Sequence, residues 1–408
     1  MAGISIAGNT FEEYKHDAND VVHIKLVRKQ EDLNDDTTTF KPDMTHQVFG
    51  ESESIFGYRD LKVELYCTAA RMITYINVHY TDKLSLERDG VCPDNIAEKL
   101  KDVLEPGYFT NLDGFLGQLP KEIHFKPFGE KIHEYNVTKK SQTKQFEIYK
   151  TKIENLGFRS YHKRIQPFLL LYVDGASYID DDDERWVFYL IFEKYTCDGE
   201  TMHAFVGYAT VYNYFAYPER IRPRISQVLI MPPYQKQGHG AQLIQTFYNH
   251  CYARPEVLDI TVEDPSENFQ RVRDFVDVRN CAKLKSFQPE KLAEGFSYDM
   301  QWEAREKLKI NRKQARRVYE ILRLKNTNSF DQDGYLAYKL DVKKRLNMPF
   351  MKNGRDFQKL QRVLNPNELK ATMTNLSREQ RLEFLEKSFN ELKEVYDRVI
   401  ERVHLSKT

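Results

Sequence analysis

The feature that most constrains the fold is a run of alternating segments, residues 186–214, that passes directly into a strand–loop–helix–strand pattern, residues 226–262. Trp186–Tyr195 and His203–Tyr214 have the alternation and the aromatic and β-branched content of strands, and the turn-rich loop between them predicts an antiparallel pair. In the second part a helical crossover separates two strands, and such a connection joins parallel strands. The chain is therefore predicted to hold a mixed sheet with flanking helices, an α+β fold.

The sequence on either side of this region divides the chain into three predicted domains. In the last of them, apolar residues recur at three- and four-residue spacing with charges between them, which is typical of helices. The expected domains are an N-terminal α+β domain at 1–122, a central domain with the mixed sheet at 123–276 and a basic helical domain at 277–408. Strands are also expected at His23–Val27 and Tyr58–Tyr66, and helices at Asp94–Leu104, Phe146–Phe158, Lys291–Leu324 and Arg378–Leu405.

Charge and cysteine content limit the class of protein. The 408 residues include 61 basic and 61 acidic ones, but residues 301–408 have a net charge of +10 and residues 1–300 of −10. The longest apolar runs are far shorter than the roughly 20 residues of a membrane-spanning helix, so no contact with a membrane is expected. The five cysteines lack the close pairs of zinc sites and disulfide frameworks. We expect reduced thiols in a cytosolic or nuclear protein, and no metal.

The loop before the predicted helix at Ala241–Arg254 carries a phosphate-binding signal. Gln235–Ala241 places Gly238 and Gly240 at a helix N-terminus, where unpaired N–H groups and the positive end of the helix dipole suit a pyrophosphate. Glycines let the backbone approach a phosphate closely. A Walker loop would end in Gly-Lys-Ser/Thr, and a dinucleotide loop would need a glycine where this chain has Leu243, so neither motif fits. A plain tight turn is the alternative.

In this context, Gln-x-x-Gly-x-Gly resembles the acetyl-CoA loop of the GNAT superfamily of N-acetyltransferases. Further segments narrow the resemblance to the family of type B histone acetyltransferase catalytic subunits, from about residue 20 to the end of the chain. These segments are Thr45–Gly50, Asp182–Trp186, Tyr212–Phe215, Arg222–Gln227, Gln237–Gln242, Leu258–Ser266 and Gln314–Arg323.

The resemblance implies that acetyl-CoA is the co-substrate. In that superfamily the two parallel strands splay apart after the loop, which leaves backbone groups free to bind pantetheine. Val228, Leu229 and Ile230 would then lie beside the pantetheine and the thioester. The alternative is an ordinary core strand, and both interpretations can hold, because the backbone and the side chains have different roles. The implied pyrophosphate contacts are Gln235, Lys236, Gln237, Gly238, His239, Gly240 and Ala241. We expect His239 to act through its backbone rather than as a catalyst, and Lys236 to be a solvated surface residue.

Acetylation of a lysine requires a base, because the pKa of the ammonium group is about 10.4 in water. Glu263 and Asp264 end the strand that is expected to face the cofactor strand, so both are candidate catalytic residues. Asp264-Pro-Ser-Glu267 also has the pattern of a helix start with Asp264 as the N-cap. Glu263 is therefore the predicted general base, in agreement with the family. Our hypothesis is that burial beside the apolar strand, and the neighbouring Asp264, raise its pKa.

Two further groups complete the predicted site. Asp174 matches a family position with a supporting base role that usually carries Glu, and a turn-forming Asp before Gly175 is the alternative. The acidic run around Asp180–Glu184 is either a solvated loop or a docking surface for a basic, flexible peptide such as a histone tail. The resemblance implies tail contacts at Glu51, Ser52, Glu53, Trp186, Tyr212, Asn213 and Tyr214, with Ser52 standing where an acidic residue is common.

The resemblance implies an enzyme that acetylates lysines in the N-terminal tail of newly synthesised, soluble histone H4 before chromatin assembly. Direct attack needs no covalent intermediate, so the lack of a Ser/His/Asp or Cys/His arrangement fits. The alternative is a non-catalytic chaperone module that binds the histone tail and CoA. The expected partners are histone H4, with histone H3, and a WD-repeat histone-binding subunit, in the nucleus and the cytoplasm. Direct binding of nucleic acid is not expected.

Overall fold

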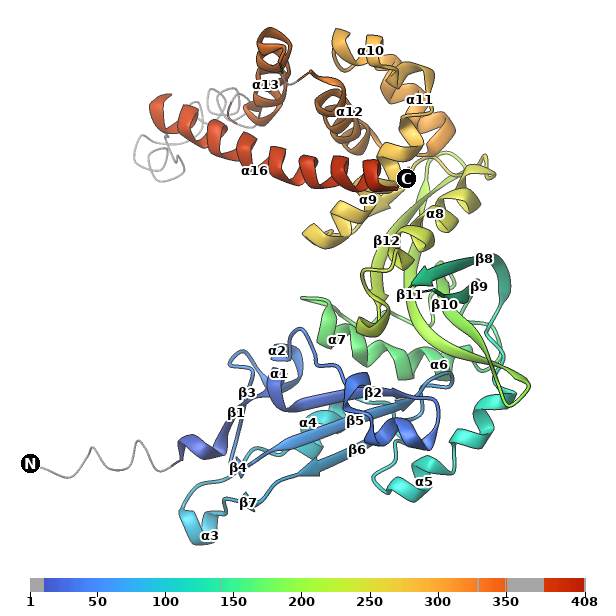
Figure 1. The fold of residues 1–408 in the computed structure, drawn as a ribbon, viewed down its shortest axis with the longest axis vertical. Helices are drawn as coiled ribbons and strands as arrows, with labels where there is room; N and C mark the ends of the chain where they lie inside the picture. The colour runs from blue at the N-terminus through green and yellow to red at the C-terminus, as the bar shows by residue number, and fades with distance from the viewer. Residues whose placement is uncertain (1–10, 140, 329, 349, 351–377, 407–408) are drawn as a thin grey trace, which may run out of the picture. The chain divides into compact units, whose positions relative to one another are not determined.

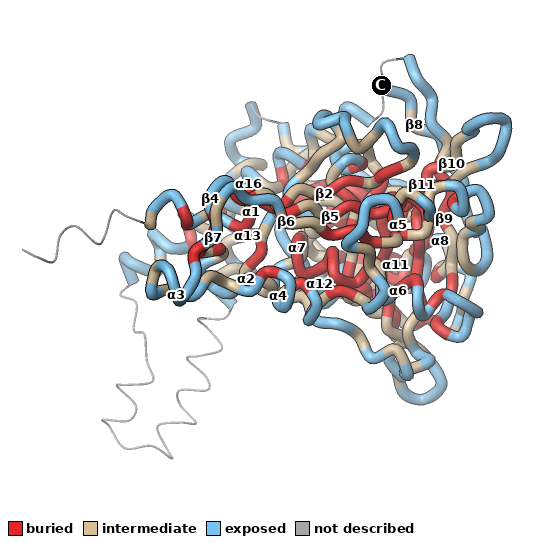
Figure 2. Tube along the Cα trace, turned by 90° about the horizontal axis from the view of Figure 1, so that it is seen from below, coloured by how far each residue is buried: buried red, intermediate tan, exposed pale blue. Residues whose placement is uncertain are grey.

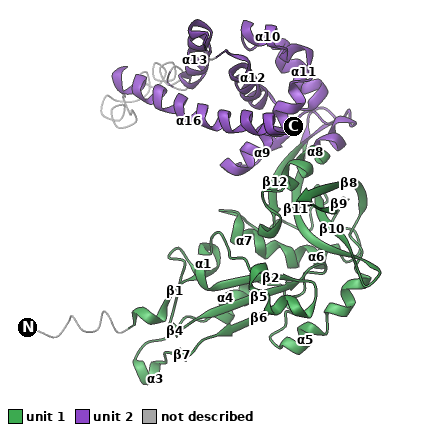
Figure 3. Cartoon of the chain, viewed as in Figure 1, with its two compact units in different colours: residues 1–214, 223–247 green, residues 215–222, 248–408 purple. Residues whose placement is uncertain are grey.

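The computed structural model describes residues 11–139, 141–328, 330–348, 350 and 378–406 (Figure 1). The chain forms two compact units, shown in different colours in Figure 3. The first unit comprises residues 1–214 and 223–247, and the second comprises residues 215–222 and 248–408. The three domain boundaries expected from the sequence stay a prediction.

The N-terminal part of the first unit is built on a three-stranded sheet. Strand β2 (Val22–Val27) runs parallel to β5 (Lys62–Thr68), which is antiparallel to β6 (Thr74–His79). The short pairs β1–β3 and β4–β7 lie beside it. The smaller elements are β1 (Lys15–Asp17), α1 (Ala18–Val21), α2 (His46–Phe49), β3 (Ser54–Phe56), β4 (Tyr58–Arg59), β7 (Asp82–Lys83), α3 (Leu86–Asp89), α4 (Ile96–Val103) and α5 (Leu112–Leu116). Buried residues line β2 and β5, whereas α3 is exposed (Figure 2).

Two of the three elements predicted here are confirmed with bounds that differ by one or two residues: β2 matches the strand at residues 23–27, and α4 matches the helix at 94–104. The predicted strand at 58–66 is divided into β4 and β5 by a turn at Asp60, whose φ is +52°. Helices α6 (Phe158–Ile165) and α7 (Leu169–Tyr172) lie between this sheet and the larger sheet of the same unit (Figure 1).

The larger sheet of the first unit is an antiparallel meander. Its strands β8 (Glu130–Lys139), β9 (Gln142–Thr151), β10 (Trp186–Cys197) and β11 (Glu200–Ala216) pair in chain order, and β12 (Arg220–Ile230) follows β11. The predicted pair of strands around the loop at 196–201 is thus confirmed. The helix expected near Phe146–Phe158 is wrong, because residues 142–151 form β9. Glu147, at the centre of β9, is buried and ion-paired to Lys131 and Lys194. A charged residue in this segment is typical of a solvated helix face, but here it belongs to a buried part of a strand.

Helix α8 (His239–Tyr252) follows β12. In the second unit, the segment after α8 makes a parallel contact with the start of β12. The N–H of Ile221, at the start of β12, donates to the carbonyl of Glu256 at 2.8 Å, and the N–H of Leu258 donates to the carbonyl of Ile221 at 2.9 Å. Ile221 and Val257 form a parallel bridge, which confirms the predicted parallel crossover. Of the predicted strand at 257–262, only Thr261–Val262 is regular strand, β13.

The rest of the second unit is helical, as the C-terminal pattern predicted. Its helices are α9 (Glu267–Cys281), α10 (Pro289–Glu294), α11 (Tyr298–Leu308), α12 (Arg312–Asn326), α13 (Gln332–Leu346) and α16 (Arg378–Leu405). The single helix expected over 291–324 is interrupted twice, at Gly295 with φ +108° and at Lys309 with φ +56°. A left-handed residue ends an α-helix because the chain can no longer continue the i→i−4 hydrogen bonds.

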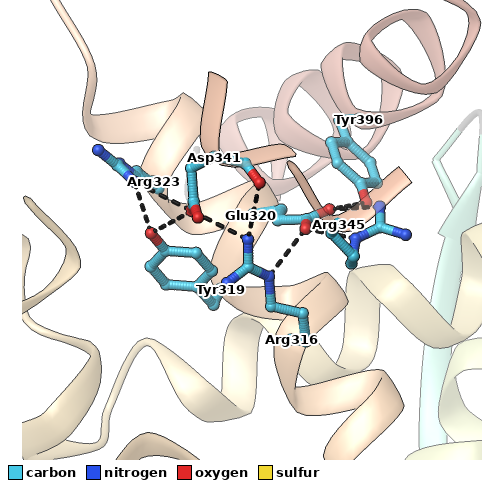
Figure 4. A network of polar contacts seen from close by, with 7 residues as sticks. All are labelled: Arg316, Tyr319, Glu320, Arg323, Asp341, Arg345 and Tyr396. Carbon is cyan, nitrogen blue, oxygen red and sulfur yellow. Dashed lines mark hydrogen bonds and ion pairs between the residues drawn. The ribbon is translucent and has the colours of Figure 1, made fainter. Parts of the chain in front are cut away.

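Part of the basic charge of the helical region is neutralised inside it (Figure 4). The carboxylate of Glu320 is fully buried and accepts hydrogen bonds from Arg316 at 2.9 Å, from Arg345 at 2.6 and 2.8 Å, and from the hydroxyl of Tyr396 at 2.9 Å. Arg316 also lies 2.9 Å from Asp341. Removing one member of such a network would leave a buried charge unpaired, so these arginines serve the core of α12, α13 and α16.

Candidate functional site

The predicted phosphate-binding loop is an exposed arch between two buried side chains. Tyr234, the last residue of a 3-10 turn at Pro232–Tyr234, and His239, the first residue of α8, are 6% and 1% exposed. Gly238 has φ +93°, and no atom lies within 4 Å of the place where a Cβ would be, so the backbone dihedral is what requires glycine. The carbonyl of Gly238 accepts the first helical hydrogen bond, from Gln242 at 3.1 Å. The N–H groups of the three residues between them therefore have no partner within the helix.

The two glutamines of the loop brace its backbone. The side-chain amide of Gln235 donates to the carbonyl of Ile230 at 2.9 Å, and that of Gln237 donates to the carbonyl of Pro233 at 2.9 Å. Lys236 is exposed, as predicted, and has φ +60°. These side chains hold the loop in one conformation, and the groups that remain available to a phosphate are the backbone N–H groups and the Lys236 ammonium.

The imidazole of His239 is a packing group. Its Nδ1 lies 2.7 Å from the hydroxyl of Tyr135, and its ring centroid lies 4.3 Å from that of Phe146. Burial lowers the pKa of His239 to about 4, so the ring is neutral at physiological pH. Its side chain is directed into the core, which leaves only its backbone for the cofactor role expected from the sequence.

The end of β12 lies against a bulge in β11. The register between β10 and β11 shifts next to Ile191, and the extra residue, Val206, accepts a hydrogen bond from the N–H of Met231 at 2.9 Å. A Cβ at Gly207 would lie only 2.3 Å from the carbonyl oxygen of Leu229. Gly207 therefore permits the close approach of β11 to the predicted pantetheine strand. It was missed from the sequence, although a lone glycine in an apolar strand is the signal for such an approach.

Glu263 and Asp264 belong to the second unit, directly after β13, and both are exposed. Our hypothesis that burial raises the pKa of Glu263 requires a buried side chain. In the protein without substrates, this side chain is exposed. The expectation that Asp264 caps α9 is wrong: Ser266 is the N-cap, and its hydroxyl accepts from the N–H of Phe269 at 3.2 Å. Asp264 instead has φ +25°, an uncommon conformation for a residue with a side chain. Its carboxylate is thus not committed to the helix.

Asp174 follows α7 with its side chain 81% exposed. One carboxylate oxygen lies 3.3 Å from Nε2 of His46, and Gly175, which follows, has φ +65°. The turn-forming interpretation fits this geometry, and the carboxylate is paired to a histidine of α2.

The acidic residues predicted near α2 differ in what they contact. Glu53 accepts hydrogen bonds from the N–H groups of Thr45 at 2.6 Å and His46 at 3.0 Å, and from the amide of Asn19 at 3.0 Å. The bond from Thr45, opposed by partial burial and aided by the other bonds, lowers the pKa of Glu53. Its carboxylate anchors α2 within the protein. Glu51 and Ser52 are exposed, and the Ser52 hydroxyl lies 2.9 Å from that of Ser54.

The predicted aromatic contacts form one cluster on β10 and β11. Trp186 is paired with Tyr212 across the strands, with ring centroids 4.9 Å apart, and Tyr214 lies 4.6 Å from Tyr212. The guanidinium of Arg185 lies 4.8 Å from the centroid of the Tyr212 ring, and that of Arg224 lies 4.6 Å from the centroid of the Tyr214 ring. We call Trp186, Tyr212 and Tyr214 the aromatic cluster. The rings of Tyr212 and Tyr214 thus already attract cations within the protein itself. Asn213, between the two tyrosines, donates its N–H to the carbonyl of Arg185 at 3.2 Å.

The acidic run before the aromatic cluster is largely paired within the protein. Asp181 lies 3.1 Å from Nδ1 of the buried His162, Asp182 lies 2.8 Å from Arg159, and Asp183 lies 2.6 Å from Arg185. The Tyr212 hydroxyl also donates to Asp183 at 2.9 Å. Less negative charge is available to a basic peptide than the sequence suggested.

An exposed helix N-terminus that follows an antiparallel meander, beside a bulged strand, fits the class of protein that the sequence resembles: an N-acetyltransferase that uses acetyl-CoA. Comparison with known proteins narrows the class. A family model described as histone acetyl transferase HAT1 N-terminus matches residues 14–174, and one described as histone acetyltransferase type B catalytic subunit, C-terminal, matches residues 273–324. The chain is 47% identical over 393 residues to the histone acetyltransferase type B catalytic subunit of Homo sapiens, which covers 96% of this chain and 94% of that protein.

The relatives extend beyond animals. The histone acetyltransferase type B catalytic subunit of Cryptococcus neoformans is 32% identical over 375 residues, which cover 83% of this chain and 90% of that protein. This chain belongs to the family of histone acetyltransferase type B catalytic subunits, and it is an acetyl-CoA-dependent histone acetyltransferase. A solved structure of an aminoglycoside acetyltransferase from an uncultured soil metagenomic sample aligns with a TM-score of 0.24 and 16% identity, over 34% of this chain and 88% of that one.

Two features are absent from the residues that the structure describes. No described helix has both the length and the apolar character needed to cross a bilayer. Among the residues that the structure places, no three His, Cys, Asp or Glu side chains are grouped as metal ligands would be.

Proposed function

We propose that this enzyme acetylates lysines in the N-terminal tail of newly synthesised, soluble histone H4, with Glu263 as the general base. The observation that carries the donor side is the exposed arch between Tyr234 and His239. Its free N–H groups at the start of α8, together with the helix dipole, suit the pyrophosphate of acetyl-CoA. Family membership supports a histone as the acceptor.

The chemistry proposed for the chain's own residues is direct transfer. Glu263 takes a proton from the lysine ammonium, which frees the nitrogen lone pair to attack the thioester carbonyl. The backbone N–H of Leu229 or Ile230 stabilises the negative oxygen that forms. When the carbonyl is restored, the C–S bond breaks, and the CoA sulfur takes the remaining excess proton of the nitrogen, so that CoA leaves as the thiol. An exposed Glu263 is accessible to a peptide. In this proposal the bound peptide and donor supply the desolvation that the protein alone does not.

Asp264 and Asp174 are proposed as supporting carboxylates. Asp264 stands beside Glu263, and its carboxylate is not used as a helix cap, so it is available to hold the incoming ammonium. Asp174 is one methylene shorter than the family's usual Glu and already contacts His46, which favours a minor role for it.

The histone tail is proposed to contact Glu51, Ser52, Glu53, Trp186, Tyr212, Asn213 and Tyr214. The aromatic cluster offers ring edges and faces to the aliphatic stem and ammonium of a lysine. Glu51 offers an exposed carboxylate, whereas Glu53 would act by shaping α2. Histone H3 and a WD-repeat histone-binding subunit are the proposed partners, with action before chromatin assembly in the nucleus and cytoplasm.

The decisive experiment measures CoA release from acetyl-CoA with a histone H4 tail peptide. We expect Glu263→Gln to lower kcat by a factor of roughly 10²–10⁴ while acetyl-CoA binding is kept. Glu267→Gln, which removes an exposed carboxylate four residues further on, is the matched control and should retain activity. A Glu263→Gln variant with wild-type kcat would exclude Glu263 as the base. A wild-type protein that binds both substrates but releases no CoA would favour the non-catalytic alternative.

A further inference from the structure

An ion network around the buried carboxylate of Glu193 contacts the residue that precedes the proposed pyrophosphate loop. Arg28, the residue after β2, lies 2.6 Å from the carboxylate of Glu193 on β10 and donates a second hydrogen bond to the hydroxyl of Tyr234 at 2.8 Å. The Tyr234 hydroxyl donates to the same carboxylate at 2.9 Å. Lys144 completes the network at 3.0 Å from the other carboxylate oxygen. All of these residues belong to the first unit.

The network is charged and tightly held. Glu193 has a side chain only 3% exposed; burial alone would raise its pKa, but the hydrogen bond and charge of Arg28, with the charge of Lys144, lower it. Burial raises the pKa of Tyr234 well above its usual range, so the hydroxyl stays a hydrogen-bond donor at physiological pH. Arg28 also stacks over Tyr195, with its guanidinium 4.5 Å from the ring centroid. Charge-assisted, buried hydrogen bonds of this kind fix geometry more firmly than exposed ones.

This network holds one end of the loop, and a separate contact holds the other. Tyr234 immediately precedes Gln235, and His239 closes the arch with its hydrogen bond to Tyr135. The rings of Tyr234 and His239 lie 6.0 Å apart, and Phe146 packs against both. A site made of backbone N–H groups binds an anion only when those groups already point at it, because ordering them on binding costs free energy.

We propose that Arg28 is a positioning residue for the acetyl donor: through Tyr234 and Glu193 it fixes the pyrophosphate loop, so the N-terminal sheet contributes to the donor site. Arg28 touches no substrate in this proposal. The inference rests on the proposed role of the loop, and it assigns to the residue after β2 a part in donor binding that goes beyond binding the histone tail.

The test compares two acetyl donors, of which the second lacks the pyrophosphate that the loop would hold, together with the adenosine and 3′-phosphate beyond it. Acetyl-CoA contains the pyrophosphate, whereas S-acetylpantetheine ends before it. We expect Arg28→Met and Tyr234→Phe to raise the KM for acetyl-CoA about tenfold, the effect of losing one buried charge-assisted hydrogen bond. The kcat at saturating acetyl-CoA, and kcat/KM with S-acetylpantetheine, should stay within about twofold of wild type. The double variant should lose little more than either single one, because both break the same link.

The matched control is Glu147→Gln. Glu147 is a buried carboxylate on the adjacent strand with its own lysine partners, Lys131 and Lys194, and its hydrogen bonds and ion pairs do not include Tyr234. It should lower the melting temperature as Arg28→Met does but leave the ratio of the two donors unchanged. Equal losses with both donors in Arg28→Met, or an unchanged KM, would overturn the inference. A wild-type enzyme that used both donors equally well would remove the loop's proposed role and the inference with it.

Discussion

The inward side chain of His239 agrees with the expectation that this residue acts through its backbone rather than as a catalyst. Flanked by glycines at a helix start, it resembles a ligand-binding histidine, yet its ring is 1% exposed and bonded to Tyr135. Glycine on each side lets the backbone stay open to a ligand while the side chain turns inward. The side chains of Glu53 and Arg28 also point to partners within the protein. The carboxylate of Glu53 anchors α2, and Arg28 belongs to no sequence motif. A sequence shows that a polar residue is present, but its direction depends on distant partners.

Burial of His239 predicts a pH dependence of stability. The pKa of His239 is about 4 in the folded protein and about 6.5 in an unfolded chain, so the neutral form is favoured by folding. This contribution is fully present above pH 6.5 and is lost as the pH falls from about 6.5 to about 4, a total of about 3 kcal/mol. His239→Gln cannot titrate and should show a flatter profile in that window.

The measurement is the free energy of unfolding from urea titrations between pH 4 and 8, with the difference between the two proteins isolating His239. His124→Gln, at an exposed histidine of the first unit, is the control and should follow the wild-type curve. A constant difference between wild type and His239→Gln across this range would contradict a neutral, buried ring.

At the scale of elements, the start of α9 gives a direct test of the cap assignment. Ser266→Ala removes the hydrogen bond to the N–H of Phe269 and should lower the free energy of unfolding by about 1 kcal/mol. Asp264→Ala should cause no such loss, because Asp264 is outside the helix. Urea titrations measure the free energy of unfolding of both variants. A larger loss for Asp264→Ala than for Ser266→Ala would show that Asp264 is the cap.

Most elements could be predicted because their hydrophobic period is undisturbed. The strands β10 and β11, the helix α4 and the crossover after β12 all show an uninterrupted pattern. The predictions are wrong where a buried charge or a single backbone dihedral determines the type of an element or the residue at which it ends. Glu147 concealed β9, since its lysine partners come from other strands. Gly295 and Lys309 divide one predicted helix into three, and Asp264, with φ +25°, lies outside α9, whose N-cap is Ser266.

The candidate site could be predicted as a set of motifs but not as an arrangement. The loop at 235–241 was recognisable because its glycines lie at a helix start, which is a local property. Arg28 acts through a contact with Tyr234, which is distant in sequence, so no local pattern marks it. Gly207 does carry a local signal, a lone glycine in an apolar strand, but its partner Leu229 is distant in sequence.

At the scale of the whole molecule, charge is less available than its distribution along the chain suggests. In the acidic first three-quarters of the chain, Asp181, Asp182 and Asp183 are paired with residues of the protein itself. In the basic last quarter, Arg316 and Arg345 are paired with Glu320. Since the screening length is about 8 Å at physiological salt, only nearby unpaired charges act on a bound peptide. Recognition of a basic tail should therefore depend on a few exposed carboxylates rather than on the net charge.

Variants of Glu51 and of the pair Arg159–Asp182 distinguish recognition by a few exposed carboxylates from recognition by the net charge. Glu51→Gln removes an exposed carboxylate of the proposed tail site and should raise the KM for an H4 tail peptide about two- to fivefold, with kcat unchanged. The double variant Arg159→Gln/Asp182→Asn removes a pair whose charges already lie 2.8 Å apart, and should change that KM less than about twofold. Both values are measured at low and at physiological salt. An effect of Glu51→Gln that disappears at physiological salt would show that the tail is attracted only by long-range charge, because a contact between neighbouring groups is screened far less than a distant one.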